Sequence, residues 1–180
     1  MLYMFLADGF EEIEALATLD IIRRAGLEIK TVGVTGDIIT GSHGISVLSD
    51  CVTGDITADK LDGVILPGGL PGTTNLEKDK IVCEYIEISN NGGLLIAAIC
   101  AAPSILGHMG ILNGKKATCF PGFEDELKGA LCSEEFVVQH GNIITAKGAG
   151  AALDFGLMIV EYFKGTDFSE ELRKTMQCVR

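Results

Sequence analysis

The sequence predicts an α/β domain with a largely parallel central sheet, and two observations support that prediction. Uncharged aliphatic runs, such as Leu2–Leu6, Gly63–Leu66 and residues 94–99, are typical of strands buried on both faces. Between them lie longer stretches with apolar residues at helical spacing, such as residues 11–25. Strands that alternate with helices form parallel sheets with helices on both faces.

The individual elements follow from these patterns. Strands are expected at residues 2–6, 28–34, 63–66, 94–99 and 116–120, with hairpins at 37–48 and 136–146. Helices are expected at residues 11–25, 75–90, 103–109, 151–163 and 168–177, with a short helix after Pro121-Gly122. Asp8 followed by Glu11 predicts a capping box for the first helix, and Gly26 predicts its end.

Composition narrows the class of protein. At 180 residues, 47% hydrophobic and 22% charged, the chain predicts one globular domain over residues 1–180. Its first residues resemble a strand rather than a signal peptide, and no apolar run approaches the ~18 to 20 residues of a membrane span. A net charge of -11 without a basic stripe argues against a nucleic-acid partner. We therefore expect neither a membrane nor a nucleic acid among its partners.

The cysteines indicate the compartment. Six are scattered at positions 51, 83, 100, 119, 132 and 178, with no C-x-x-C pair and no metal-like cluster with histidine. In a chain with a large core, this pattern favours reduced thiols and a cytoplasmic protein without a metal site. Four of them, Cys51, Cys83, Cys132 and Cys178, are expected to be structural.

One stretch predicts a reactive thiol. The aliphatic strand at 94–99 runs into Cys100, and Pro103 then suits the first turn of a helix. A sharp strand-to-helix turn of this kind is a nucleophile elbow, which lifts a side chain clear of the sheet. The helix dipole would favour the thiolate there. The alternative is a buried core cysteine, which is common for free thiols.

Three predicted strands end in turns that lie at the same edge of the sheet. These turns are at Asp8-Gly9-Phe10, at Pro67-Gly68-Gly69 and at Cys100. Ligands of parallel sheets gather at the carboxyl ends of the strands. We therefore expect a functional site at this edge.

Three motifs then occur in order: Asp8-Gly9-Phe10-Glu11-Glu12-Ile13-Glu14, Leu66-Pro67-Gly68-Gly69 and Ala97-Ala98-Ile99-Cys100-Ala101-Ala102-Pro103. Together they resemble the DJ-one/ThiJ/PfpI superfamily, and the resemblance extends over nearly the whole chain, including residues 20–26 and 145–150. It implies a flavodoxin-like, doubly wound domain of the class I glutamine-amidotransferase type.

The resemblance also implies roles for particular residues. Cys100 corresponds to the family's reactive cysteine, and Glu14 to the glutamate that contacts its sulfur. Burial among apolar neighbours would raise the pKa of Glu14 and keep it protonated, whereas Glu11 and Glu12 are expected to be solvated. The backbone N–H groups of Gly69 and Ala101 match the family's oxyanion-hole positions.

The chain departs from the family pattern at several pocket positions. Ala101 stands where members with a Cys–His pair carry histidine, and Phe120 stands where others carry histidine before a proline. Lys147 occupies an arginine position and lacks its bidentate fork. Gly68 belongs to the same pocket, and Cys119 lies beside the replaced histidine, either as a resolving thiol or as a buried residue. The three histidines, His43, His108 and His140, are expected to be structural or exposed, so peptidase chemistry is disfavoured.

Two leading functions remain open. The resemblance implies a cofactor-independent glyoxalase or protein deglycase acting on small reactive carbonyls such as methylglyoxal, with Cys100 as nucleophile and Glu14 as proton carrier. The alternative is an oxidative-stress sensor or chaperone-like protein that works through oxidation of Cys100. A cysteine hydrolase or amidotransferase and a thiamine-pathway protein rank lower.

The resemblance further implies a homodimer, with the first helix and residues 35–48 as contact elements. From the elbow and from Glu14 we also predict a Cys100 pKa well below the ~8.5 of a free cysteine.

Overall fold

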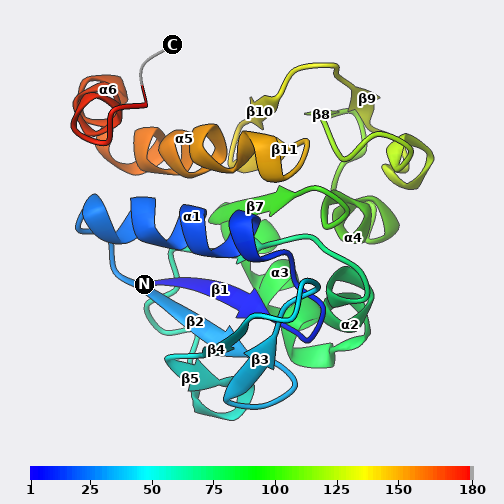
Figure 1. The fold of residues 1–180 in the computed structure, drawn as a ribbon. Helices are drawn as coiled ribbons and strands as arrows, with labels where there is room; N and C mark the ends of the chain where they lie inside the picture. The colour runs from blue at the N-terminus through cyan, green and yellow to red at the C-terminus, as the bar shows by residue number, and fades with distance from the viewer. Residues whose placement is uncertain (179–180) are drawn as a thin grey trace.

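The computed structural model describes residues 1–178 and has a seven-stranded sheet at its centre (Figure 1). The strand order is β10-β11-β7-β6-β1-β2-β5, and every neighbouring pair is parallel except β10 with β11. The strands are β1 Leu2–Leu6, β2 Ile29–Gly33, β5 Cys51–Val52, β6 Gly63–Leu66, β7 Leu95–Ile99, β10 Val137–His140 and β11 Ile143–Ala146. The predicted α/β class with a mostly parallel sheet is confirmed.

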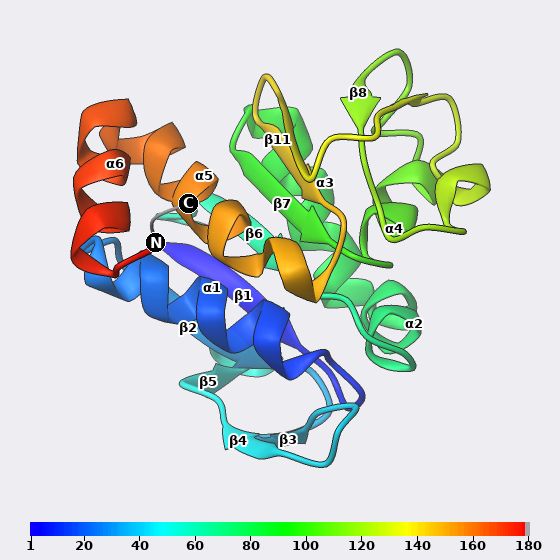
Figure 2. The same ribbon diagram turned by 45° about the horizontal axis from the view of Figure 1, so that its top comes forward.

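Helices cover both faces of this sheet. One side carries α1 Glu12–Arg24 and α5 Ala152–Lys164, with α6 Thr166–Thr175 packed on α5; the other carries α2 Gly72–Lys78, α3 Lys80–Gly92 and α4 Pro103–His108. Figures 1 and 2 both place α1 and α5 side by side. Three 3₁₀ turns lie at Thr53–Asp55, Glu124–Glu126 and Ala149–Ala151. Within residues 1–178, no helix has both the length and the hydrophobicity to cross a membrane.

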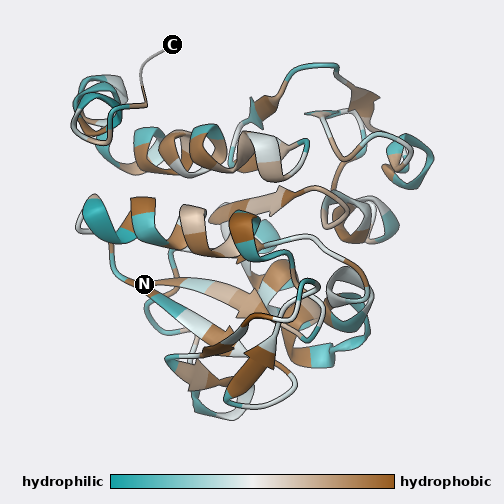
Figure 3. Cartoon of the chain, in the orientation of Figure 1, coloured by the Kyte–Doolittle hydropathy of each residue, from teal (hydrophilic) through white to brown (hydrophobic). Residues whose placement is uncertain are grey.

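Alternation along β1 explains the two helical layers. Leu2, Met4 and Leu6 pack into the core under α1 and α5, whereas Tyr3 and Phe5 pack into the core under α3 and α4. Successive side chains of a strand point to opposite faces, so an all-apolar strand must have helices on both sides. Figure 3 shows the consequence, with apolar strands inside and polar stretches on outer helices such as α6.

Two predicted elements differ in the structure, and the edge strand β5 is not predicted by the sequence. The helix expected over residues 75–90 is two helices, because the Asp79 side chain accepts hydrogen bonds from the N–H groups of Ile81 and Val82 and caps a new start. The strand expected at 116–120 is only β8 Lys116–Ala117, which pairs with the unpredicted β9 Leu131–Cys132.

A separate two-stranded hairpin, β3 Ile38–Thr40 and β4 Ser46–Leu48, lies beside the start of α1. The predicted capping box is wrong: the Asp8 carboxylate accepts from Thr40 N at 2.8 Å, and Ser42 N donates to Phe10 O at 2.8 Å. Glu11 is the actual N-cap of α1, with its carboxylate 2.8 Å from Glu14 N. These bonds hold the turn between β3 and β4 over the first turn of α1.

Candidate active site

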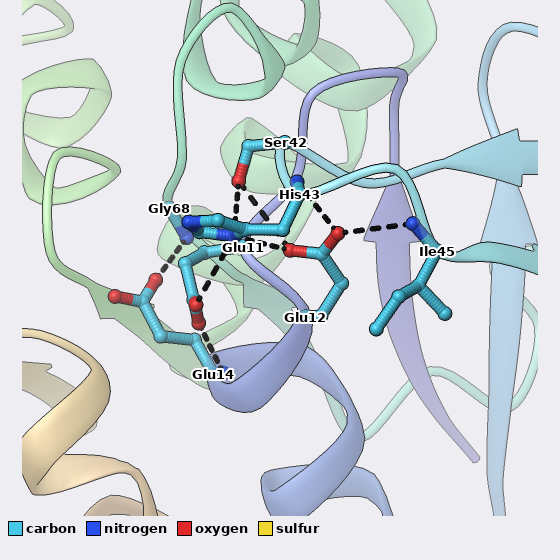
Figure 4. Close-up of polar contacts among 7 residues, drawn as sticks. All are labelled: Glu11, Glu12, Glu14, Ser42, His43, Ile45 and Gly68. Atoms are coloured by element: carbon cyan, nitrogen blue, oxygen red, sulfur yellow. Dashed lines mark hydrogen bonds and ion pairs between the residues drawn. The ribbon is translucent and has the colours of Figure 1, made fainter.

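The turns after β1, β6 and β7 meet at one edge of the sheet, as the sequence predicts. Glu14 lies in the first turn of α1, and its Oε2 accepts a hydrogen bond from Gly68 N at 2.9 Å (Figure 4). In the other direction, Glu11 N donates to Gly68 O at 2.9 Å. The start of α1 and the turn after β6 are therefore joined by a reciprocal pair of hydrogen bonds.

Cys100 occupies the sharp turn between β7 and α4. Its φ is 65°, in the left-handed region that few side chains other than glycine adopt. The turn is fixed on both sides, because Cys100 N donates to Ala146 O at 2.9 Å and Phe120 N donates to Cys100 O at 2.8 Å. This is the backbone conformation that the elbow interpretation requires.

Gly68 lets the catalytic candidates approach one another. A Cβ at this position would lie 2.5 Å from Cys100 Cβ and 2.8 Å from Glu14 Oε2. Real Cβ atoms do not tolerate such contacts, so a side chain at residue 68 would separate Glu14 from Cys100. The glycine is required by close packing here rather than by its backbone angle.

The carboxyl of Glu14 is almost completely buried, with 1% of the residue exposed. Burial raises its pKa to about 7, and the nearby charge of Glu11 adds to that rise, while hydrogen bonds from Cys100 and from Gly68 N–H oppose it. The prediction that burial raises the pKa of Glu14 is confirmed. At neutral pH this group can either accept or supply a proton.

The pKa prediction for Cys100 is wrong in direction. Burial and the charge and hydrogen bond of Glu14 raise the pKa of the thiol to about 12, against the lowering effect of the Gly69 and Ala101 N–H groups. Helix α4 begins only at Pro103 and is six residues long, so its dipole is small at the sulfur. The thiol keeps its proton while Glu14 is ionised, and Glu14 is the group placed to remove it.

Glu12 was expected to be solvated but is buried, with 4% of the residue exposed. Its carboxylate accepts from His43 N at 2.7 Å, contacts His43 Nδ1 at 2.9 Å and lies 3.4 Å from Ile45 N (Figure 4). Burial acts to raise its pKa, but the hydrogen bonds from His43 and Ile45 outweigh burial and lower the pKa to about 2.

The contacts of Glu12 also bring together three side chains of the types that bind metal ions, and the sequence spacing does not reveal this cluster. Ligand-type atoms of Glu11, Glu12 and His43 lie within 4.8 Å of one another, although no metal cluster is expected from the sequence. Each of these side chains already has a structural hydrogen bond: Glu11 caps α1, and Glu12 and His43 bond to each other. His43 itself is exposed, as predicted.

The remaining pocket candidates separate into two groups. Phe120 and Lys147 line a hollow of about 340 Å³ beside the site, and the Lys147 ammonium lies 2.9 Å from the Glu134 carboxylate. Cys119 is buried, and burial raises the pKa of its thiol to about 12. Its sulfur is close to Phe123 N–H, and Cys119 is not part of the lining of the hollow, which favours the buried-residue alternative.

Comparisons with known proteins show the family of this chain. Residues 1–162 match the family model described as the DJ-1/PfpI family. Protein dj-1beta of Drosophila melanogaster is 35% identical over 174 residues, covering 95% of this chain and 93% of that protein. A Caenorhabditis elegans protein named glutathione-independent glyoxalase DJR-1.2 is 32% identical over 168 residues, covering 92% of this chain and 89% of that protein.

The fold comparison gives the same result. The structure of oxidised DJ-1 from Toxoplasma gondii superimposes with a TM-score of 0.94 at 29% identity, covering 98% of this chain and 97% of that one. Sequence and fold therefore match the same group of proteins over nearly all of the described residues, and the chain belongs to the DJ-1/PfpI family.

Proposed function

We propose that the protein is a cofactor-independent glyoxalase that converts methylglyoxal-type dicarbonyls into 2-hydroxy acids. The observation that supports this most is the close approach of Cys100 and the buried Glu14 carboxyl at Gly68, with the pKa of Glu14 raised to about 7. A base with a pKa near the working pH is the most effective proton carrier. The printed name of the nematode relative is consistent with the same chemistry.

The first step forms a bond between sulfur and the aldehyde carbon. Glu14 accepts the thiol proton as Cys100 Sγ adds to the aldehyde, which overcomes the high pKa of the resting thiol. The aldehyde oxygen takes the electron pair of the broken π bond. The Gly69 and Ala101 N–H groups, which act to lower the pKa of the Cys100 thiol, would donate hydrogen bonds to that oxygen. The proton held by Glu14 then completes the hemithioacetal.

The second step moves a proton between carbons. Glu14 removes the proton from the sulfur-bearing carbon, which gives an enediolate with its charge on the former ketone oxygen. That oxygen takes the hydroxyl proton of the hemithioacetal, and the proton on Glu14 returns to the neighbouring carbon to give a thioester. Water hydrolyses the thioester, so the thiol is regenerated and a 2-hydroxy acid leaves. The sum is one dicarbonyl plus one water, without an external oxidant or reductant. The same addition step would serve a deglycase acting on carbonyl adducts of proteins.

Lactate formation from methylglyoxal in the absence of glutathione tests this proposal. Cys100→Ser and Glu14→Gln should each lower the rate by about 100-fold or more, because nucleophile and base are lost respectively. Cys83→Ser, at a partly buried free thiol of α3, is the matched control and should retain the rate. Lactate production that survives in both site variants would refute the proposal.

A second candidate is redox sensing at Cys100, favoured by the donors around its sulfur. The Gly69 and Ala101 N–H groups and a protonated Glu14 would stabilise the anionic oxygens of a sulfinate. After mild peroxide, intact-mass analysis should find two added oxygens in the wild type and none in Cys100→Ser. A wild-type protein that turns over no methylglyoxal yet gains these oxygens would replace the glyoxalase proposal with this one.

We also propose a homodimer through α1 and the β3–β4 hairpin, as the family resemblance implies. Four large apolar side chains are exposed there: Ile13, Ile38, Ile45 and Leu48. A contiguous exposed apolar surface favours association. Light scattering should give twice the monomer mass, and Leu48→Glu should shift it towards the monomer; a wild-type monomer would contradict the proposal.

A further inference from the structure

We propose that the hollow beside Cys100 and Glu14 is an apolar subsite, and that Phe120 and Phe136 make the protein favour dicarbonyls with an aromatic or bulky apolar substituent over methylglyoxal. The inference rests on the proposed function, because it concerns the substrate of that same site.

The lining of the hollow is apolar and open. Its volume is about 340 Å³, and it is bordered by Phe120, Pro121, Phe136, Lys147, Gly148, Ala149, Gly150 and Ala151. Both phenylalanines are largely exposed, at 47% for Phe120 and 57% for Phe136. Large aromatic side chains that line an open hollow offer apolar area to a ligand, and ring-to-ring contact adds to it.

The hollow borders the catalytic candidates through Gly148 and Phe120. A Cβ on Gly148 would lie 3.1 Å from Phe120 Cδ2 and 3.7 Å from Glu14 Oε1. The phenyl ring and the carboxyl therefore lie on either side of this glycine, with space for about one atom between them. Phe120 N also donates to Cys100 O at 2.8 Å. A carbonyl carbon bonded to Cys100 Sγ would therefore direct its substituent towards the two rings.

Charge in this region does not favour an acidic substituent. Lys147 is the cation of the lining, and its Nζ lies 2.9 Å from the exposed Glu134 carboxylate, which compensates its charge. The phenyl ring of Phe120 offers no N–H donor to an acidic substituent. The subsite therefore fits a neutral ring or branched aliphatic group.

The experiment compares kcat/KM for phenylglyoxal and methylglyoxal. The wild type should prefer phenylglyoxal, and Phe120→Ala and Phe136→Ala should each lower that preference by about tenfold, because they remove apolar contact from one substrate only. Phe168→Ala on α6, 43% exposed and outside the hollow, is the matched control and should leave the preference unchanged.

Each outcome is decisive. Turnover of methylglyoxal with no change of preference in either alanine variant would overturn the subsite and leave the proposed function standing. If neither dicarbonyl is turned over, calorimetry on Cys100→Ser decides instead: mandelate should bind at least about tenfold more tightly than lactate, and adding Phe120→Leu or Phe120→Ala should reduce that difference. Equal affinity for the two hydroxy acids would overturn the inference.

Discussion

Glu12 and Glu14 lie two residues apart in the same turn of α1, and both are buried. Their pKa values are nevertheless shifted in opposite directions. The pKa of Glu12 is lowered to about 2, whereas that of Glu14 is raised to about 7. Burial acts to raise the pKa of both carboxyls. The difference arises from the donors: Glu12 meets the His43 imidazole and the N–H groups of His43 and Ile45, and Glu14 meets one N–H and a thiol.

The comparison separates a structural carboxylate from a reactive carboxyl. Glu12 is ionised under all ordinary conditions and binds the β3–β4 turn to α1. Glu14 has too few donors to stabilise a charge fully, so its proton remains exchangeable near neutral pH. The supply of hydrogen-bond donors, together with the depth of burial, therefore decides which glutamate can do chemistry.

The largest expected effect is the loss of stability in Glu12→Gln. The folded pKa of Glu12, about 2, lies below its reference value of 4.5, so its contribution is present above pH 4.5 and is lost as pH falls towards 2. That interval corresponds to about 3 kcal/mol. Urea unfolding followed by circular dichroism should give a deficit of this order at pH 7 that shrinks by pH 3.

The matched control is Glu84→Gln, an exposed carboxyl on α3, which should change stability by less than about 0.5 kcal/mol. A deficit in Glu12→Gln that is the same at pH 3 and pH 7 would contradict the assigned pKa.

Glu14→Gln should do the reverse and stabilise the fold. The folded pKa of about 7 lies above 4.5, so wild-type stability falls as pH rises between these values. The neutral amide has no such cost of ionisation. The variant should therefore be more stable by about 3 kcal/mol at pH 8 and similar to the wild type at pH 4. Unfolding curves at the two pH values test this, and a variant less stable at pH 8 would show that the ionised carboxyl is well solvated after all.

A smaller effect is expected for His43→Ala. Hydrogen bonding and the charge of Glu12 raise the pKa of His43, so the charged imidazole stabilises the fold below its unfolded pKa and that contribution is lost as pH rises through the folded pKa. The side chain is exposed, so solvent weakens the effect. The Tm difference from wild type should be larger at pH 6 than at pH 9, with His140→Ala as an exposed control. A Tm difference that is independent of pH would mean that the charge of His43 does not contribute to stability.

The smallest expected change is in the acidity of Glu14 when Glu11 is neutralised. Glu11 raises the pKa of Glu14 by its charge, although it ranks below burial as a cause. Glu11→Gln keeps an oxygen to accept the hydrogen bond from Glu14 N and removes the charge. A ¹³C titration of the Glu14 carboxyl should give a lower pKa than in the wild type, whereas Asp20→Asn on the exposed face of α1 should leave it unchanged. An equal or higher value in Glu11→Gln would contradict the assignment.

The sequence predicts the parts of the molecule that depend on local pattern. The strands β1, β6 and β7 are apolar throughout, so their burial and parallel pairing follow, and the three turns at their ends meet as expected. Glu14 and Cys100 are found because each lies in a recognisable motif next to such a turn. Gly68 belongs to the same group, although only the structure shows that a Cβ there would press against Cys100.

The missed features depend on distant residues. In the sequence, Glu12 is one more acid in an acidic helix start. Its partner His43 is 31 residues away, so no local signal predicts the burial of Glu12. The predicted low pKa of Cys100 rests on the elbow and on a protonated Glu14, whereas burial and the charge of Glu14 raise the pKa of the thiol. Phe136 joins Phe120 only because β10 folds back against β11.

The left-handed backbone of Cys100 has a consequence for how this protein tolerates change. A residue with a side chain at φ 65° carries strain of about 1 to 3 kcal/mol, which glycine would relieve. Cys100→Gly should therefore give a more stable but inert protein, whereas β-branched residues at this position should be poorly tolerated. Selection for stability alone would remove the thiol, so this turn is a place where activity and robustness oppose each other.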